Sequence, residues 1–221
     1  KTQESYMAIK NLKGANINGK TVLVRANVDV PLDDGVVADN FRLVSLIPTI
    51  DYLLKQKCKI ILFGHLGRPR GEWNEKYSLR PVAQRLAELL KIKFHRTDCE
   101  FPQSAVNQLV FCNGDLNQEK VRHSIAEALP HNIILLENIR FYKENDENNS
   151  FFAKKLAGLA DAYVNESFAM DHRKEASVVA ITKYLPAYAG LQLEQEMQLL
   201  DRVTQQPKHP FVVMMGGAKI S

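Results

Sequence analysis

Short apolar runs alternate along the chain with stretches in which apolar residues recur every three or four positions. An uninterrupted run of four or five apolar residues is typical of a buried strand, whereas the spaced pattern is typical of an amphipathic helix. Their alternation predicts an α/β fold, a Rossmann-like three-layer αβα domain with a mainly parallel sheet. The runs expected to form strands are residues 21–25, 59–63, 92–95, 109–112, 133–137, 161–164 and 211–215.

Capping and interrupting residues mark the helices between these strands. We expect Ser78 to cap one helix, and Asn149 or Ser150 to cap a second. Residues 40–56 carry another helical pattern, in which the interior Pro48 should kink or restart the helix because proline lacks the N–H of the helical ladder.

The pattern changes near the end of the chain. A long helix is predicted over residues 191–206, and the strand predicted at 211–215 leads into Gly216, Gly217 and Lys219. A strand that runs into glycines and a lysine resembles the opening of a phosphate-binding unit. We therefore expect a first domain at 1–190, an interdomain helix at 191–206, and the start of a second, otherwise missing domain at 207–221.

Composition narrows the class of protein. The 221 residues are 45% hydrophobic and 24% charged, as in ordinary globular proteins. Lys and Arg exceed Asp and Glu only by 29 to 25, which argues against nucleic acid as a partner. No apolar run approaches the roughly 20 residues that cross a bilayer, so we expect a cytoplasmic protein with no membrane partner. Cys58, Cys99 and Cys112 are isolated, and we assign the chain no disulfide and no metal site.

The strongest chemical signal is Gly64-His65-Leu66-Gly67-Arg68-Pro69, directly after the run at 59–63. Glycines allow a tight turn, and the imidazole and guanidinium suit an anion. Arg25, Arg140 and Arg173 also come at or just after the ends of predicted strands. Because the carboxyl ends of parallel strands share one edge, these side chains should converge on one anion pocket. The alternative is a set of separate surface ion pairs, which contribute little.

Together these motifs resemble the phosphoglycerate kinase family over nearly the whole chain. The family has two Rossmann-like domains joined by a helix; the first binds 3-phosphoglycerate or 1,3-bisphosphoglycerate, and the second binds Mg-ADP or Mg-ATP. The residues that carry the resemblance are Val22-Leu23-Val24-Arg25, Asn27, Asp29, Val30, Pro31, Arg42, His65 to Pro69, Leu135 to Phe141, His172-Arg173 and Gly216-Gly217-Ala218-Lys219.

The resemblance implies roles for these side chains. Arg68, Arg140 and Arg173 would hold the 3-phosphate that is not transferred. Arg42 would approach the carboxyl or acyl-phosphate end and His65 would help to orient it. The implied substrate-binding set is Asn27, Asp29, Arg42, His65, Arg68, Arg140 and Arg173; the implied catalytic residues are Arg42 and Lys219; the implied nucleotide-binding residues are Gly216, Gly217 and Lys219; a possible basic patch adds Arg25 and His172.

Two departures from the family pattern bear on affinity. Asn27 and Asp29 stand where the family usually has Asp and Asn, so that the carboxylate and the amide are exchanged. Glu175 replaces a histidine of the basic patch, and we expect it to pair with Arg173 or Lys174 and to weaken phosphoglycerate binding. Further differences in the same loop are Glu166, Ala169, Met170 and Asp171.

The resemblance thus implies a monomeric glycolytic kinase that transfers a phosphoryl group reversibly between 1,3-bisphosphoglycerate with ADP and 3-phosphoglycerate with ATP. This chain would bind phosphoglycerate weakly and would not turn over alone. A second hypothesis is a non-catalytic anion-binding or interaction module that kept the scaffold after its site drifted; Asn27, Asp29 and Glu175 favour it.

Overall fold

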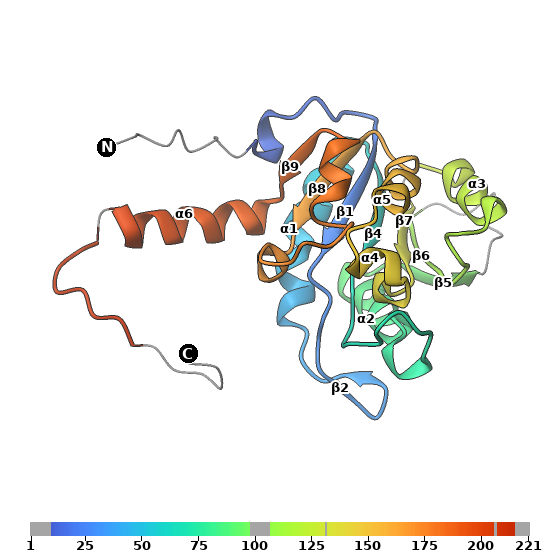
Figure 1. Cartoon of the computed structure of the whole chain (residues 1–221), viewed down its shortest axis with the longest axis horizontal. Coiled ribbons are helices and arrows are strands. Elements are labelled where there is room, and N and C mark those ends of the chain that lie inside the picture. Colours follow the sequence, from blue (N-terminus) through green and yellow to red (C-terminus); the bar gives the residue numbers. More distant parts are fainter. Residues whose placement is uncertain (1–9, 98–106, 131, 206, 215–221) are drawn as a thin grey trace.

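A seven-stranded sheet forms the centre of the molecule, for which a computed structural model describes residues 10–97, 107–130, 132–205 and 207–214 (Figure 1). The strand order is β5-β6-β7-β4-β1-β8-β9, and every neighbouring pair is parallel. The strands are β1 (Thr21–Ala26), β4 (Lys59–Phe63), β5 (Lys93–Thr97), β6 (Gln108–Cys112), β7 (Ile133–Leu136), β8 (Ala162–Glu166) and β9 (Ala187–Ala189).

Helices cover both faces of the sheet, as the alternation of side chains along the strands requires. Val22 and Val24 of β1 point into one core with α1 and α2, whereas Leu23 points into the other core with α3 and α5. The predicted three-layer αβα fold is therefore confirmed. The helices are α1 (Phe41–Lys55), α2 (Arg80–Leu90), α3 (Glu119–Glu127), α4 (Lys143–Asp146), α5 (Ser150–Ala157) and α6 (Leu191–Gln205).

Six of the seven predicted strands are present, with ends that differ from the prediction by at most two residues. The strand predicted at 211–215 is wrong over residues 211–214, which are exposed and outside any sheet. A strand needs a neighbour for its backbone N–H and C=O groups, and an apolar run alone supplies none. The sequence pattern missed β9 and the hairpin of β2 (Leu32–Asp33) and β3 (Val36–Val37), which are too short to show a period.

The predicted helix caps are partly right. Asn149 caps α5, with its side-chain oxygen accepting from Phe151 N and Phe152 N. Ser78 lies one residue before the cap position of α2. Its hydroxyl accepts from Arg80 N at 3.2 Å and donates to Glu137 at 2.8 Å, so it stabilises the start of the helix from outside.

Pro48 does not restart α1, which runs unbroken from Phe41 to Lys55. A proline removes the N–H that would bond to the carbonyl four residues earlier, here that of Val44. Both Pro48 and Val44 are exposed, so water can satisfy the freed carbonyl. The interruption that the sequence suggested is therefore tolerated on the solvent side.

Helix α6 projects from the body of the molecule and is held at its first turn (Figure 1). The buried carboxylate of Glu166, at the end of β8, accepts from Gln192 N at 3.1 Å and Leu193 N at 3.2 Å, and Thr49 donates to it from α1. Burial raises the pKa of Glu166, while these hydrogen bonds oppose the rise. One carboxylate thus ties α6 to both the sheet and α1.

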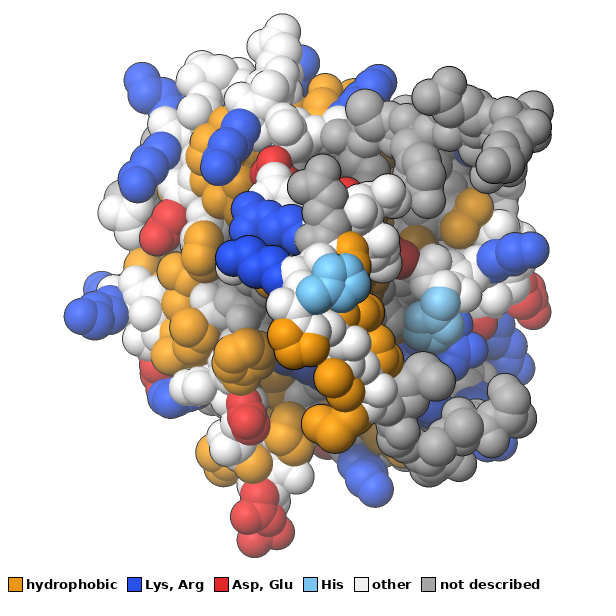
Figure 2. Space-filling model, turned by 90° about the vertical axis from the view of Figure 1, so that its left-hand side faces the viewer, with side chains coloured by type: hydrophobic (Ala, Val, Ile, Leu, Met, Phe, Trp, Pro, Cys, Tyr) orange, Lys and Arg blue, Asp and Glu red, His pale blue; other side chains and the backbone are white. Residues whose placement is uncertain are grey.

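Beyond this first turn α6 exposes apolar side chains: Leu199 is 52% exposed, Leu200 46% and Val203 45%. Figure 2, which views the side on which α6 projects, shows hydrophobic side chains gathered there. None of the helices in the described ranges is both long and apolar enough to cross a membrane.

Replacement of Gly190 by alanine tests the anchoring of α6. An added Cβ would lie 1.9 Å from Glu166 Oε2, so the carboxylate would have to leave the helix terminus. We expect Gly190→Ala to lower the free energy of unfolding by about 1–3 kcal/mol in urea titrations. Gly158→Ala is the matched control, because its nearest contact would be an ordinary 3.4 Å. Equal stability of the two variants would contradict the proposed anchor.

Candidate anion-binding site

The predicted anion-binding residues lie at the carboxyl ends of four adjacent strands, β7, β4, β1 and β8. Arg140 follows β7, and His65 and Arg68 follow β4. Asn27 and Asp29 follow β1, and Arg173 follows β8. Parallel pairing places all four ends on one edge, so residues far apart in the sequence meet there.

Two glycines allow the backbone after β4 to approach its neighbours. A Cβ on Gly64 would lie 2.3 Å from a methyl of Val28 and 2.9 Å from the carbonyl of Ala26. Gly67 has φ +63°, a conformation that favours glycine, and a Cβ there would lie 2.5 Å from the ring of Tyr77. The loop that carries His65 and Arg68 therefore depends on glycine at both positions.

Three of the predicted arginines converge. Arg68, Arg140 and Arg173 line one open cavity of about 510 Å³, which we call the basic pocket. The arginines are therefore not spread over separate faces. The remaining residues that line the basic pocket are Arg70, Asp146, Lys174 and Glu175.

Arg42 lies apart from this pocket, in the first turn of α1. It lines a small cavity of about 40 Å³ with Asn27 and Glu166. The side-chain oxygen of Asn27 is buried there without a hydrogen-bond partner. A buried polar atom without a partner is costly, so this amide is available to a ligand group.

Asp29 connects the two regions. Its carboxylate accepts from Gly67 N at 2.9 Å, and its Oδ2 lies 3.5 Å from His65 Nε2 and 4.0 Å from Arg42 Nη1. Arg42 also donates to the backbone carbonyl of Asp29. Burial alone would raise the pKa of Asp29, but His65, the Gly67 N–H and Arg42 together lower it to about 2. Asp29 is therefore an anion that holds surrounding donors in place.

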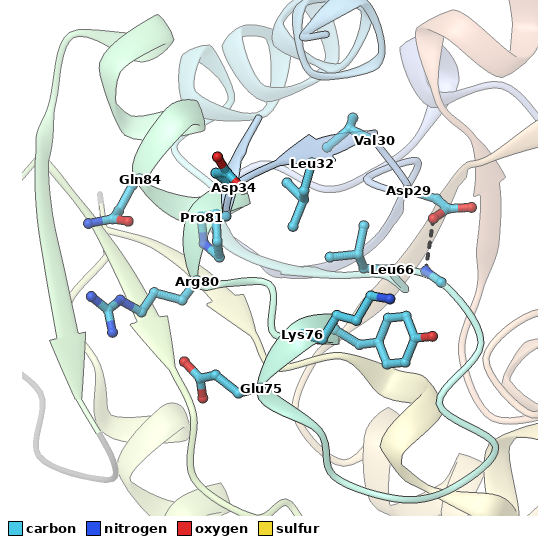
Figure 3. Close-up of a pocket in the computed structure, with 13 residues that line it drawn as sticks. Asp29, Val30, Leu32, Asp34, Leu66, Glu75, Lys76, Arg80, Pro81 and Gln84 are labelled. Atoms are coloured by element: carbon cyan, nitrogen blue, oxygen red, sulfur yellow. Dashed lines mark hydrogen bonds between the residues drawn. The ribbon is translucent and has the colours of Figure 1, made fainter. Parts of the chain in front are cut away.

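Asp29 also borders a neighbouring cavity of about 670 Å³ between the β2–β3 hairpin and the start of α2 (Figure 3). Leu32 and Leu66 contribute apolar walls, while Glu75 and Arg80 lie at its rim (Figure 3). Tyr77 also lines the cavity. None of the predicted arginines lines this space. The basic pocket, although smaller, is the one with the charges that an anion requires.

Arg25 lies within β1, not after it, and its side chain is completely buried. It donates to Ala26 O at 3.1 Å and contacts His65 Nδ1 at 3.0 Å. It is therefore a structural residue and not part of the exposed basic patch that the sequence suggested. A guanidinium can only donate, so His65 Nδ1 accepts and the proton of the neutral imidazole sits on Nε2, facing Asp29.

Glu175 pairs differently from the prediction. Its carboxylate accepts from Arg140 at 2.8 Å and from Asn145 at 3.2 Å, and it lies 3.8 Å from Arg25. It contacts neither Arg173 nor Lys174 as an ion pair, because burial turns it away from those exposed side chains. Burial alone would raise the pKa of Glu175, but Arg140 and Arg25 hold it below its ordinary value.

The remaining predicted residues do not line the basic pocket or are not described by the structure. His172 is exposed and does not line the basic pocket. Gly216, Gly217 and Lys219 lie outside the described residues. Within the described ranges no three His, Cys, Asp or Glu side chains are grouped as a metal would require.

Two further residues position the site, and sequence reasoning placed them in a motif without assigning them a role. Glu137, at the end of β7, accepts from Ser78 Oγ and Leu79 N at 2.8 Å each. Asn138 donates to Leu66 O and Tyr77 O at 2.8 Å each. These bonds hold the loop that carries Arg68 in place. In the sequence, only the position of this polar pair directly after a buried strand indicated such a role.

A sequence model described as "Phosphoglycerate kinase" matches residues 12–221. The chain belongs to the phosphoglycerate kinase family. Among curated relatives, the phosphoglycerate kinase of Desulforudis audaxviator is 43% identical over 216 residues, and that of Pelotomaculum thermopropionicum 39% over 215 residues. Each alignment covers 97% of this chain and 51% of the relative. The chain thus spans about half the length of these kinases.

Solved phosphoglycerate kinases share the fold. The structure from Coxiella burnetii superposes with a TM-score of 0.76 at 30% identity, covering 91% of this chain and 46% of that one. The structure from Pyrococcus horikoshii gives 0.73 at 27% identity, covering 91% and 47%. These likenesses support the α/β fold of the phosphoglycerate kinase family over the described body of the chain.

The environment of His65 predicts a pH dependence. Burial lowers its pKa, the charges of Arg25 and Arg140 lower it further, and Asp29 opposes them. As the pH falls, His65 therefore binds a proton in the unfolded chain before it does so in the folded chain. Its contribution to the free energy of unfolding is complete above about pH 6.5 and is lost as the pH falls through the folded pKa.

We expect nitrogen NMR to show the Nε2–H tautomer of His65 well below pH 6.5, whereas the urea-unfolded chain titrates normally. Unfolding free energies measured between about pH 5 and 7 should depend less on pH in His65→Gln than in the parent chain. Protonation of His65 at its ordinary pKa, or an Nδ1–H tautomer, would contradict the described contacts.

Proposed function

We propose that this chain forms the phosphoglycerate-binding part of a phosphoglycerate kinase. The complete enzyme transfers a phosphoryl group reversibly between 1,3-bisphosphoglycerate with ADP and 3-phosphoglycerate with ATP in glycolysis. The observation that carries this proposal is the convergence of Arg68, Arg140 and Arg173 on one pocket at the sheet edge. Membership of the family favours the enzyme over a non-catalytic module on the same scaffold.

The arrangement suits the chemistry. Phosphoryl transfer depends on positioning and charge neutralisation more than on covalent catalysis, and guanidinium groups provide both. The basic pocket is assigned to the phosphate that stays on the substrate. Arg42 and Asn27, which line the small cavity beside Asp29, are assigned to the carboxyl or acyl-phosphate end. His65, which also contacts Asp29, is assigned to the middle of the substrate.

Asp29 would limit how closely a substrate carboxylate approaches, because two anions repel. The exchange of Asp29 with Asn27 nevertheless leaves one amide facing the Arg42 cavity. We therefore assign Asn27 to a substrate oxygen and Asp29 to the positioning of His65, Arg42 and the Gly67 turn.

The nucleotide end of the reaction is assigned to a further domain. Gly216, Gly217 and Lys219 would begin it, and α6 would be the interdomain helix; its exposed apolar side chains support a covering partner. Mg-ADP or Mg-ATP would bind mainly there, so the chain alone should bind substrate without turnover. We further propose a monomeric cytoplasmic enzyme without nucleic-acid or membrane partners.

Isothermal titration of the chain with 3-phosphoglycerate tests the proposal. We expect weak binding at millimolar ligand that weakens further with added salt, because salt screens exposed charges. Arg68→Gln and Arg173→Gln should each reduce affinity by about fivefold to tenfold, the loss of one charge-assisted hydrogen bond.

Arg96→Gln is the control, since Arg96 is exposed on the edge strand β5 and does not line the pocket, and it removes the same charge. Its affinity should stay within about twofold of the parent chain. Absence of binding by a chain with an intact NMR spectrum would refute the assignment of the pocket.

A further inference from the structure

Glu175 places a carboxylate inside the basic pocket, against the arginine that the family pattern assigns to phosphate. Its Oε1 accepts from Arg140 Nη2 at 2.8 Å, and the two side chains are only 6% and 11% exposed. The other oxygen, Oε2, accepts from Asn145 and lies 3.8 Å from Arg25. The pair is thus surrounded by protein on most sides.

Arg140 has both terminal nitrogens engaged. Nη1 donates to Gly67 O at 3.0 Å, and Nη2 donates to Glu175 Oε1 at 2.8 Å. A phosphate that took the place of Glu175 on Arg140 Nη2 would leave Glu175 as a buried anion without its closest cation, which is strongly unfavourable. Arg140 is therefore poorly placed to change partners when a substrate arrives.

Four other cations line the same pocket and are exposed: Arg68, Arg70, Arg173 and Lys174. In the described parts of the chain none of the four forms an ion pair. Five cations against Asp146 and Glu175 leave the pocket net positive. Anion binding without Arg140 therefore remains electrostatically favourable.

Backbone structure places Arg70 at this pocket. Arg70 has φ +60°, a conformation that few side chains other than glycine adopt. The next residue, Gly71, donates its N–H to Arg140 O at 3.0 Å. The turn that carries Arg70 is thus tied directly to the turn that carries Arg140.

We propose that Glu175 makes Arg140 a positioning residue and that an outer set of cations, Arg68, Arg70, Arg173 and Lys174, binds the phosphate. Arg70 and Lys174 become substrate-binding residues, and Arg140 acts through the Gly67 turn. This inference rests on the proposed phosphoglycerate site. Because the outer cations are exposed, binding in this chain depends strongly on salt.

Titration with 3-phosphoglycerate separates the two sets. We expect Arg70→Gln and Lys174→Gln each to lower affinity by about fivefold to tenfold, as for the loss of a charged hydrogen-bond donor. The matched controls Arg96→Gln and Lys183→Gln remove exposed charges elsewhere and should change affinity by less than about twofold. Glu175→Gln should raise affinity, because it removes the competing anion and frees Arg140.

The role of Arg140 is tested in two backgrounds. Arg140→Gln alone can unfold the chain by leaving Glu175 unpaired, so the double variant Arg140→Gln with Glu175→Gln is measured beside Glu175→Gln. We expect the double variant to bind about tenfold more weakly than Glu175→Gln, because Arg140 reaches the phosphate once Glu175 is glutamine. Where the NMR spectrum shows that Arg140→Gln alone is folded, its loss of affinity relative to the parent chain should be smaller. Equal losses in the two backgrounds would contradict the inference.

The outcomes separate the inference from the proposed function. No binding by the folded parent chain overturns both. Binding by the parent chain that is unchanged in Arg70→Gln and Lys174→Gln overturns the outer set and leaves the phosphoglycerate site intact. A Glu175→Gln chain that binds more weakly than the parent, with an unchanged NMR spectrum, also overturns the inference.

Discussion

A guanidinium that is entirely removed from water constrains the whole carboxyl edge of the sheet. Arg25 extends from β1, an interior strand of the sheet, and burial of a charge without partners is prohibitively costly. Burial lowers its pKa, and the nearby Glu175 carboxylate acts in the opposite direction. Its guanidinium contacts Ala26 O at the end of β1, His65 in the loop after β4 and Glu175 in the loop after β8. The two terminal nitrogens of this one residue therefore link the end of β1 to both loops.

A chain of contacts then runs from Arg25 to the neighbouring loops. His65, fixed by Arg25, lies against Asp29, and Asp29 holds both the Gly67 turn and Arg42. Buried carboxylates at the neighbouring strand ends act in the same way on helices: Glu137 binds the start of α2 and Glu166 the start of α6. Helix N-termini carry partial positive charge and attract anions, so these two carboxylates hold the helices at the sheet edge.

The sequence predicted the sheet, the shared edge and the meeting of Arg68, Arg140 and Arg173, because hydrophobic runs and strand-end chemistry are both local signals. It could not predict the partner of Glu175, since Arg140 lies 35 positions away in the chain. The pattern suggested Arg173 or Lys174, which are near in sequence but exposed. Similarly, no local signal distinguishes a buried Arg25 from an exposed one, because burial depends on which loops close over the strand end.

The charge balance of the pocket explains why an anion at Glu175 is compatible with an anion site. Closely spaced arginines repel one another when no ligand is bound, and an internal carboxylate relieves that repulsion between Arg25 and Arg140. The same carboxylate reduces the field available to a ligand. Asp29 likewise holds His65 and Arg42 in place while it reduces the positive field around them. In the proposed site, Glu175 holds the inner cation Arg140 in place, and the exposed cations farther out meet the phosphate.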